Sequence, residues 1–295
     1  MVKIVTHNSG FHADDVFAVA TLILSLPEDT PVEIVRTRED VEISSADYVV
    51  DVGGVYDSAQ KRFDHHQTAG AGKRENGIPY ASFGLVWREY GEYISGSKEI
   101  RDIIEQKLVM FVDALDNGVS IVESRYEDLR PYDISDYFYS YWIDEQVDPQ
   151  EIDRIFKRVV SLAENLLKRE VEKARRIIEE GKIVESIYEK TVDKRIITLD
   201  KHLAWGKVMI EKPEPLIVIY PTSDGEKWNA KTVRVELNSF ETRILFPESW
   251  AGKADGELSA VSGVSDAVFC HRARFLVVAK SKEGAITLAQ KALEQ

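Results

Sequence analysis

The chain has 295 residues, of which 44% are hydrophobic and 30% are charged. At roughly 100 to 200 residues per domain this length predicts two domains, and the composition excludes a disordered or fibrous protein. No stretch approaches the roughly 18 consecutive apolar residues of a membrane-spanning helix. The sequence opens on a predicted strand without a leader pattern, so we expect a cytoplasmic protein with no membrane contact. Its single cysteine, Cys270, excludes an internal disulfide and a thiolate metal site.

The net charge of −13 is unevenly placed along the chain. Residues 201–295 carry 13 Lys and Arg against 12 Asp and Glu, whereas residues 1–200 carry 25 against 39. A strongly acidic body repels polyanions, which argues against broad nonspecific binding to duplex nucleic acid. The acidity instead fits carboxylates that hold divalent cations.

The first 52 residues predict a β-α-β unit. Runs rich in Val and Ile predict buried strands over residues 2–6, 32–37 and 48–52, and apolar residues at helical spacing predict a helix over residues 14–26 before Pro27. Such units build a doubly wound, mostly parallel sheet, and ligands collect at the carboxyl ends of its strands.

The rest of the chain predicts a second, smaller α/β lobe joined by a long helix. Helices are expected over residues 98–116 and, for about 30 residues, from Pro149 to Gly181, with an irregular or short-helical cover over residues 123–153. Strands over 195–199, 216–220, 231–235 and 275–279 precede a closing helix over 282–293. We therefore expect an α/β protein with a catalytic domain at 1–150, a helical linker at 151–194 and a substrate-binding lobe at 195–295.

Imidazoles and carboxylates gather where these predicted elements end, in four segments: His7, His12, Asp14 and Asp15 within residues 6–15; Asp51; Asp64, His65 and His66; and Asp113 and Asp116. Each piece alone has a structural explanation, such as a helix N-cap for Asp14, an ordinary strand exit for Asp51, or a surface position for the His pair. Their conjunction favours metal binding. Mixed imidazole and carboxylate ligands suit Mn²⁺, Fe²⁺ or Mg²⁺, and two such ions form the clamp used for phosphoester hydrolysis.

This order of motifs resembles the DHH phosphoesterase superfamily of two-metal phosphatases, pyrophosphatases and nucleases. More closely, the chain resembles the melanocyte proliferating gene product family. The resemblance is carried by Thr6-His7-Asn8, Phe11-His12-Ala13-Asp14-Asp15, residues 34–38, Val49-Val50-Asp51-Val52-Gly53-Gly54, Arg62-Phe63-Asp64-His65-His66-Gln67, residues 113–118, Val261-Ser262-Gly263, Phe269-Cys270-His271 and Glu283-Gly284-Ala285.

The resemblance implies a DHH-type catalytic domain that uses two divalent cations, Mn²⁺ in preference and Mg²⁺ as the alternative, and a 3′ to 5′ exonuclease activity on RNA. It implies that one ion is held by His7, His12 and Asp51, and the other by Asp14, Asp51, His65 and Asp113. Asp64 would orient an imidazole, and His66 would donate to a substrate phosphate, with a packing role as its alternative. Asp116 is either an outer residue of the site or part of a helix-terminal turn, and Asp15 is expected to supply structural charge at a helix N-terminus.

Two departures from the family pattern affect these expectations. His12 stands where the superfamily's usual loop has its first Asp, and Val277 and Val278 replace expected glycines in the C-terminal lobe. Because valine bars close backbone approach, substrate contact would pass to side chains, for which the candidates are His271, Arg272, Arg274 and Lys280.

The sequence thus predicts a metal-dependent phosphodiesterase of short single-stranded RNA or DNA, with Asp51, Asp64 and His66 at the reaction centre. A phosphatase or phosphodiesterase of small nucleotides or pyrophosphate is the first alternative, since the acidity and the two valines favour it. A non-catalytic, metal-containing binder of RNA or protein is the second.

Overall fold

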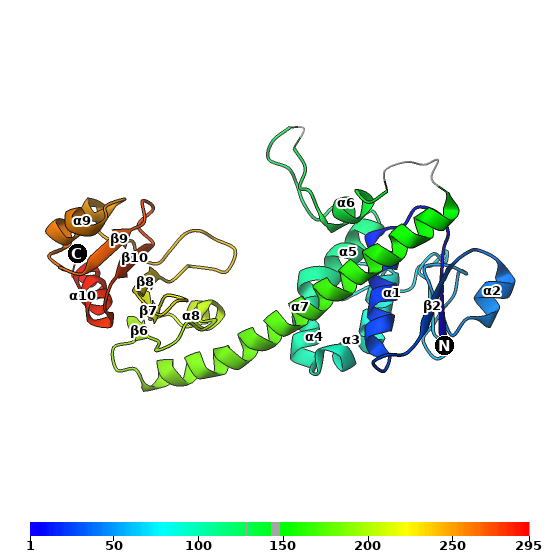
Figure 1. Cartoon of the computed structure of the whole chain (residues 1–295), viewed down its shortest axis with the longest axis horizontal. Helices are drawn as coiled ribbons and strands as arrows, with labels where there is room; N and C mark the ends of the chain where they lie inside the picture. Colours follow the sequence, from blue (N-terminus) through cyan, green and yellow to red (C-terminus); the bar gives the residue numbers. More distant parts are fainter. Residues whose placement is uncertain (128, 143–147, 295) are drawn as a thin grey trace. The chain divides into compact units, whose positions relative to one another are not determined.

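The computed structural model describes residues 1–127, 129–142 and 148–294 (Figure 1). The chain divides into two compact units, Met1–Ala174 and Arg175–Gln295, and the boundary falls within the long helix α7, Pro149–Lys190. Each unit has a five-stranded sheet with helices, which confirms the predicted α/β class.

The first unit is built on a mixed sheet of strand order β2-β1-β3-β5-β4. The strands are β1 Val2–Thr6, β2 Val32–Arg36, β3 Tyr48–Val50, β4 Tyr56–Asp57 and β5 Arg62–Phe63. The first four strands in this order run parallel, and β4 is antiparallel to β5. The carboxyl ends of β1, β3 and β5 therefore lie at one edge of the sheet.

Helices cover both faces of this sheet. Helix α1, Ala13–Ser25, and α3, Ser82–Ser95, pack against each other with Phe17 and Phe83 stacked at 4.9 Å. The short helix α2, Asp40–Ser45, lies on the other side (Figure 1), where Ile43 packs against Val5 and Val49. The first ten residues of α1 are all buried, as expected for a helix enclosed by protein.

The predicted helix over residues 98–116 consists of three helical segments. They are α4 Lys98–Ile104, the π-helical turn η1 Glu105–Val109, and α5 Met110–Asp116. A π turn changes the phase of the residues that follow it, and such turns are frequent at functional sites. Here it directly precedes Asp113 and Asp116.

Helix α6, Ile134–Tyr139, lies in the region predicted as an irregular or short-helical cover, of which residues 128 and 143–147 are outside the described part. Helix α7 has 42 residues and does not end at Gly181 as predicted. It continues because Val184 and Tyr188 extend the apolar stripe into a core with Met209. Among the described helices, none is long and apolar enough to cross a membrane.

The second unit is built on a sheet of order β6-β7-β8-β10-β9. Its elements are β6 Ile196–Thr198, α8 Gly206–Glu211, β7 Ile217–Pro221, β8 Trp228–Thr232, η2 Glu248–Trp250, α9 Asp255–Ser262, β9 Ala267–Cys270, β10 Leu276–Ala279 and α10 Lys282–Leu293. Strand β8 begins three residues before the predicted position 231. One sheet face packs on η2, α9 and α10, and α7 and α8 supply residues to a core on the other.

Candidate metal centre

Three neighbouring parallel strands each end in a candidate ligand. His7 directly follows β1, Asp51 directly follows β3, and His65 lies two residues after the end of β5. All three side chains are buried. The parallel register thus brings together residues that are up to 58 positions apart in the sequence, as expected at the carboxyl edge of a parallel sheet.

Asp51 lies between two imidazoles. Its Oδ2 is 3.2 Å from His7 Nε2 and its Oδ1 is 3.4 Å from His65 Nε2, and the Ser82 hydroxyl donates to Oδ1 at 3.2 Å. Asp51 has φ +56°, a left-handed conformation that Asp adopts more readily than most residues and that is enriched at functional sites. This conformation ends β3 at Val50, two residues before the predicted end, and fixes the carboxylate at the sheet edge.

Among the described residues, three groups place ligand atoms within 4.8 Å of one another. They are His7, His12 and Asp51; Asp51, His65 and His66; and Asp14, His65 and Asp116. Asp51 belongs to the first two groups and His65 to the last two. Shared members make the three groups one continuous cluster.

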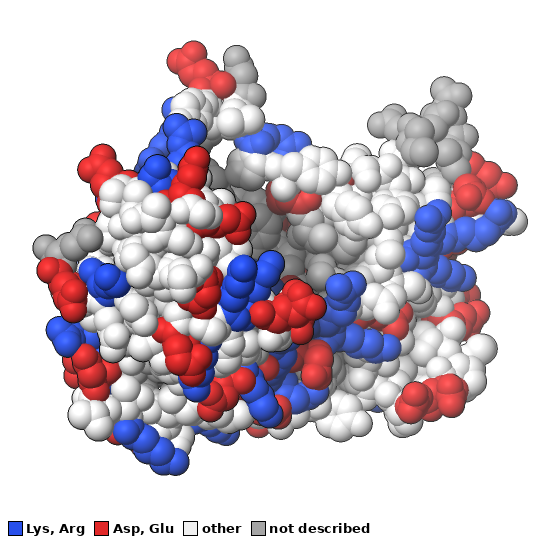
Figure 2. Space-filling view, turned by 60° about the vertical axis from the view of Figure 1, so that its left-hand side comes forward, with Lys and Arg blue, Asp and Glu red and all other residues white. Residues whose placement is uncertain are grey.

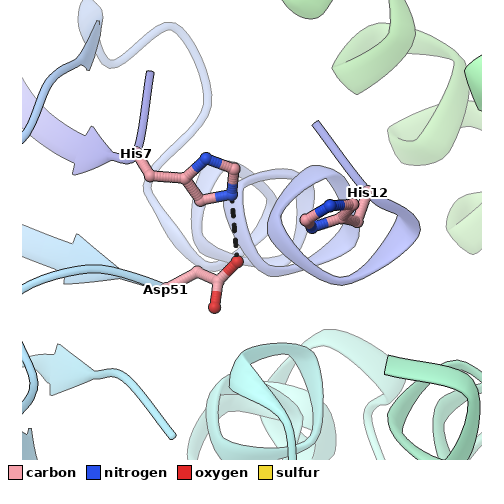
Figure 3. A group of neighbouring side chains, drawn as sticks. All are labelled: His7, His12 and Asp51. Atoms are coloured by element: carbon pink, nitrogen blue, oxygen red, sulfur yellow. Dashed lines mark ion pairs between the residues drawn. The ribbon is translucent and has the colours of Figure 1, made fainter. Parts of the chain in front are cut away.

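The first group is shown in Figure 3. His7 extends from the end of β1 toward Asp51, and His12 comes from the start of α1, with the two imidazole centres 5.5 Å apart. Ser9 Oγ lies 2.9 Å from His7 Nδ1, and Arg38 donates to the same hydroxyl at 3.2 Å. This support leaves His7 Nε2 directed at Asp51, as outer-shell partners do for metal-binding histidines.

The N-terminus of α3 holds two further carboxylates. Asp14 accepts from the backbone N–H groups of Ser82 at 3.0 Å and Phe83 at 2.7 Å, and Asp113 accepts from Gly84 N–H at 3.0 Å. The first N–H groups of a helix lack intrahelical partners and carry partial positive charge. Both carboxylates are therefore fixed by the same helix end.

Asp113 and Asp116 differ in their surroundings. Arg74 donates to Asp113 Oδ2 at 2.7 Å, and Asp113 belongs to none of the three groups found among the described residues. Asp116 Oδ2 lies 3.0 Å from His65 Nε2, and its side chain is 14% exposed. Of the two, Asp116 is the one that the fold directs at an imidazole of the cluster.

Asp64 holds the exposed His66. Asp64 Oδ1 accepts from the backbone N–H of His66 at 3.0 Å and lies 2.7 Å from its Nδ1, while Asp64 Oδ2 accepts from Gly54 N–H. The His66 side chain is 61% exposed. Its second ring nitrogen, Nε2, is therefore available to a ligand.

Asp15 contributes to the helix end and also approaches the cluster. Its Oδ1 accepts from the backbone N–H of His12 at 2.7 Å, as the expected structural role requires. Its Oδ2 is buried, has no hydrogen-bond partner among the described residues, and lies 3.4 Å from His7 Nε2. In the described part of the chain, the buried His65 Nε2 also makes no well-aligned hydrogen bond, although Asp116 Oδ2 lies 3.0 Å away.

The shifted pKa values of the cluster's residues indicate that it carries excess negative charge. Burial raises the pKa of Asp14 well above its usual range, with Asp116 and Asp51 adding to the effect, and burial raises the pKa of Asp15 and Asp113 to about 7. Burial acts to lower the pKa of His65, but Asp116 and Asp51 outweigh it and raise that pKa to about 11. Burial also acts to raise the pKa of Asp51, but the adjacent imidazoles of His65 and His7 outweigh it and lower that pKa. Divalent cations would neutralise such a cluster.

The residues present fit hard or borderline divalent ions. The donors are imidazole nitrogens and carboxylate oxygens without sulfur, which suits Mn²⁺ or Mg²⁺. A cavity of about 460 Å³ opens beside them. Its polar lining consists of His12, Asp14, Asp51, His66, Asp116, Arg130, Asp133, Ser135, Asp136 and Tyr139.

The four predicted substrate contacts lie in the second unit, at opposite ends of β10. His271, Arg272 and Arg274 belong to the tight turn between β9 and β10, whereas Lys280 follows β10. The turn corrects the expectation of a strand starting at residue 275. Arg274 has φ +60° and donates to the Phe246 carbonyl at 3.4 Å, so part of its role is to hold the turn. Val277 is buried in the core and Val278 is half-buried.

Comparisons with known proteins agree with the family resemblance. A family model with the short name MYG1_exonuc, described as an uncharacterised protein family (UPF0160), matches residues 3–293. The human protein named MYG1 exonuclease is 29% identical, with 99% of this chain and 86% of that protein covered. MYG1 proteins of Chlamydia pneumoniae and Chlamydia muridarum are 31% and 32% identical, each with 94% of this chain and 92% of the relative covered. No solved structure matches. The chain belongs to the MYG1 family.

Proposed function

We propose that the protein is a two-metal phosphodiesterase that removes nucleotides from the 3′ end of short single-stranded RNA. The observation that carries this proposal is the position of Asp51, whose two carboxylate oxygens face His7 and His65 from the end of the central strand. A carboxylate so placed can bridge two ions, which is the arrangement that two-metal phosphoesterases need. The name exonuclease carried by relatives such as the human protein supports this reaction class.

The ligand assignment follows the three groups. His7, His12 and Asp51 would hold one ion, and the third group, Asp14, His65 and Asp116, would hold the other together with Asp51, which leaves His66 of the second group to the substrate. Asp116 replaces the Asp113 of our sequence-based assignment because Asp113 is held by Arg74 and Gly84 N–H. When bound, the two ions supply an activated water and stabilise charge on the phosphoryl oxygens.

The remaining polar residues position the substrate. His66 projects into the cavity, and Asp64 holds its Nδ1, so Nε2 can donate to a phosphate oxygen. Arg130 lines the same cavity and is paired with Asp136 at 2.7 Å and 2.6 Å. An Arg side chain at this wall offers a planar phosphate donor.

The test is hydrolysis by the full chain after chelation and reloading with Mn²⁺, Mg²⁺, Zn²⁺ or Ca²⁺. We expect a 5′-labelled RNA of about ten nucleotides to shorten stepwise with Mn²⁺ and to stay intact in chelator. A DNA of the same sequence decides between RNA and DNA. Stepwise shortening that persists after exhaustive chelation would refute the two-metal assignment.

One observation favours the alternative of a small phosphate ester as substrate. The cavity is limited to about 460 Å³ and is lined by several carboxylates, including Asp14, Asp133 and Asp136, which suits a ligand with few phosphates better than a long polyanion. Mononucleotides, pyrophosphate and a dinucleotide assayed beside the RNA separate the two readings. Metal binding without hydrolysis of any of these esters would favour the non-catalytic alternative.

A further inference from the structure

One face of the second unit's sheet is only partly covered. The opposite face of the sheet is covered, since its residues Ala230, Val277 and Ala279 belong to the core that includes α10. On the open face, Lys231 of β8 pairs with Val218 on one side and with Leu276 on the other. Val218 is buried in the core that includes α7 and α8 residues, whereas Lys231 and Leu276 remain half-buried. The face therefore stays accessible over β8, β10 and β9.

A pocket of about 300 Å³ lies on this face, beside α8. Its lining includes His202, Trp205, Tyr220, Lys231, Arg234 and Leu237. The imidazole of His202 stacks on the ring of Tyr220, with centroids 5.0 Å apart and planes at 26°. The size is at the lower limit of small-ligand pockets, and the walls combine aromatic rings with two cations.

Lys231 and Arg234 have no carboxylate partner in the described part of the chain. Among the described residues, neither Lys231 nor Arg234 forms an ion pair, and Arg234 donates only to the Leu237 carbonyl, at 3.3 Å. Burial and the charge of Arg234 lower the pKa of Lys231. Two like charges held together without a counterion favour an anionic ligand.

Aromatic rings accompany the cations across the face. The Arg234 guanidinium lies 5.3 Å from the ring centre of Phe240, a side chain that is 92% exposed. Lys231 Nζ lies 5.8 Å from the ring centre of Phe275, whose ring centre is 4.3 Å from that of His271. Alternating rings and cations are the pattern of surfaces that bind single-stranded nucleic acid by base stacking and phosphate pairing.

The nearly neutral charge of the second unit also permits the binding of a polyanion. Residues 175–295 carry 19 Lys and Arg against 18 Asp and Glu, whereas residues 1–174 carry 19 against 33. Figure 2 shows positive and negative side chains interspersed over the face in view. Recognition must therefore depend on a local grouping of cations, which Lys231 and Arg234 supply.

We propose that this face binds single-stranded nucleic acid independently of the metal centre. Bases stack on the exposed rings of His202, which the buried Tyr220 supports from behind, and of Phe240, and phosphates pair with Lys231 and Arg234. The choice of ligand rests on the proposed nuclease function. The contribution of the face is affinity for the strand, and bond cleavage does not require it.

The test is anisotropy of a fluorescein-labelled single-stranded RNA of about 12 nucleotides, titrated with the full chain in chelator. The double variant Lys231→Ala/Arg234→Ala should bind at least about tenfold more weakly. The slope of log affinity against log salt should flatten by about 1.4, because each phosphate contact contributes about 0.7 on single strands. Phe240→Ala, at a site too exposed to affect folding, should weaken binding about fivefold or more.

A matched control removes two cations from the opposite side of the sheet. Lys253→Ala/Lys291→Ala changes residues near Trp250 and on α10 and should leave affinity and salt slope unchanged. Hydrolysis of a dinucleotide with Mn²⁺ should be equal in all variants, since so short a substrate needs only the metal centre.

The outcomes separate this inference from the proposed function. Dinucleotide hydrolysis together with unchanged RNA affinity in Lys231→Ala/Arg234→Ala overturns the binding face and leaves the nuclease intact. Loss of metal-free RNA binding in that variant, without hydrolysis of any substrate by the parent chain, supports the face and overturns the nuclease. If the parent chain binds no RNA in chelator, or if light scattering shows self-association that Phe240→Ala abolishes, the face serves another purpose and the inference is wrong.

Discussion

Replacing Asp116 by Asn removes the carboxylate that lies 3.0 Å from His65 Nε2, while the amide keeps the size of the side chain. If Asp116 is a direct ligand, we expect the affinity for the second Mn²⁺ to fall more than about 100-fold, because outer partners alone contribute roughly 10- to 100-fold. Turnover should fall at least as far. Stability in chelator should change little, because the lost contact between Asp116 and His65 is offset by relief of the repulsion between Asp116 and the buried Asp14.

The matched variant Asp113→Asn should have the opposite effects, a loss of stability with metal affinity retained. Asn would still accept from Gly84 N–H, but Arg74, whose side chain is 7% exposed, would lose one charged partner. Breaking a buried ion pair costs about 3 to 5 kcal/mol. Because Glu105 remains paired with Arg74 Nε, we expect a loss of about 2 to 3 kcal/mol and a melting temperature about 5 to 10 °C lower.

Calorimetric titration with Mn²⁺ and thermal unfolding in chelator measure both effects in the same preparations. The expected result is a metal defect without a stability defect in Asp116→Asn, and a stability defect with two ions still bound in Asp113→Asn. If Asp116→Asn binds two ions with unchanged affinity while Asp113→Asn loses one, the sequence-based ligand set is right and our reassignment is wrong.

Three further predictions concern the same cluster. Asp51→Asn should abolish turnover and leave the fold intact, because Asn also tolerates the left-handed backbone conformation at this position; full activity with two bound ions would contradict the bridging role. Gly84→Ala should destabilise the first unit by about 1 to 3 kcal/mol, because a Cβ there would lie 1.8 Å from Asp113 Oδ2. In the control Gly256→Ala in α9, the added Cβ would meet no atom within 4 Å, so the stability should hold or rise. If the two alanine variants lose the same stability, the steric argument is wrong. Mn²⁺ added at 100 times its dissociation constant should stabilise the chelated protein by about 2.7 kcal/mol for one site, and an unchanged melting temperature would exclude binding to the folded state.

The positions of most strands follow from the sequence alone. The runs of Val and Ile place β1 at residues 2–6 without error and β2 within one residue. They also place His7 after the first predicted strand and Asp51 near the end of the third, 48–52, which in the structure ends at Val50 and pairs with β1. Buried parallel strands give nearly continuous apolar runs, which locate β1 and β2, whereas the two-residue strand β5 before His65 gives no such run and was not predicted. The family resemblance adds the expectation that the residues at these ends hold metal.

The surroundings of the carboxylates could not be predicted in the same way. Sequence reasoning did not identify α3, although Phe83, Val86, Trp87 and Tyr90 repeat at helical spacing, and it missed the Ser82 hydroxyl that contacts Asp51. The choice between Asp113 and Asp116 depends on the phase of α5, which follows a π turn. An ideal helix places i and i+3 on one face, so spacing alone does not separate the two.

The N-terminus of α3 explains how so many carboxylates can be buried in one place. Unpaired helix N–H groups stabilise Asp14 and Asp113 from one direction, and His7 and His65 contact Asp51 from the other. These partners do not fully offset the cost of burying the negative charges, since burial still raises the pKa of Asp14, Asp15 and Asp113. The protein fold thus preserves a set of buried carboxylates whose charge divalent cations would balance. Under the proposed function, the N-terminus of α3 would therefore support the metal site through Asp14 and the stability of the first unit through Asp113.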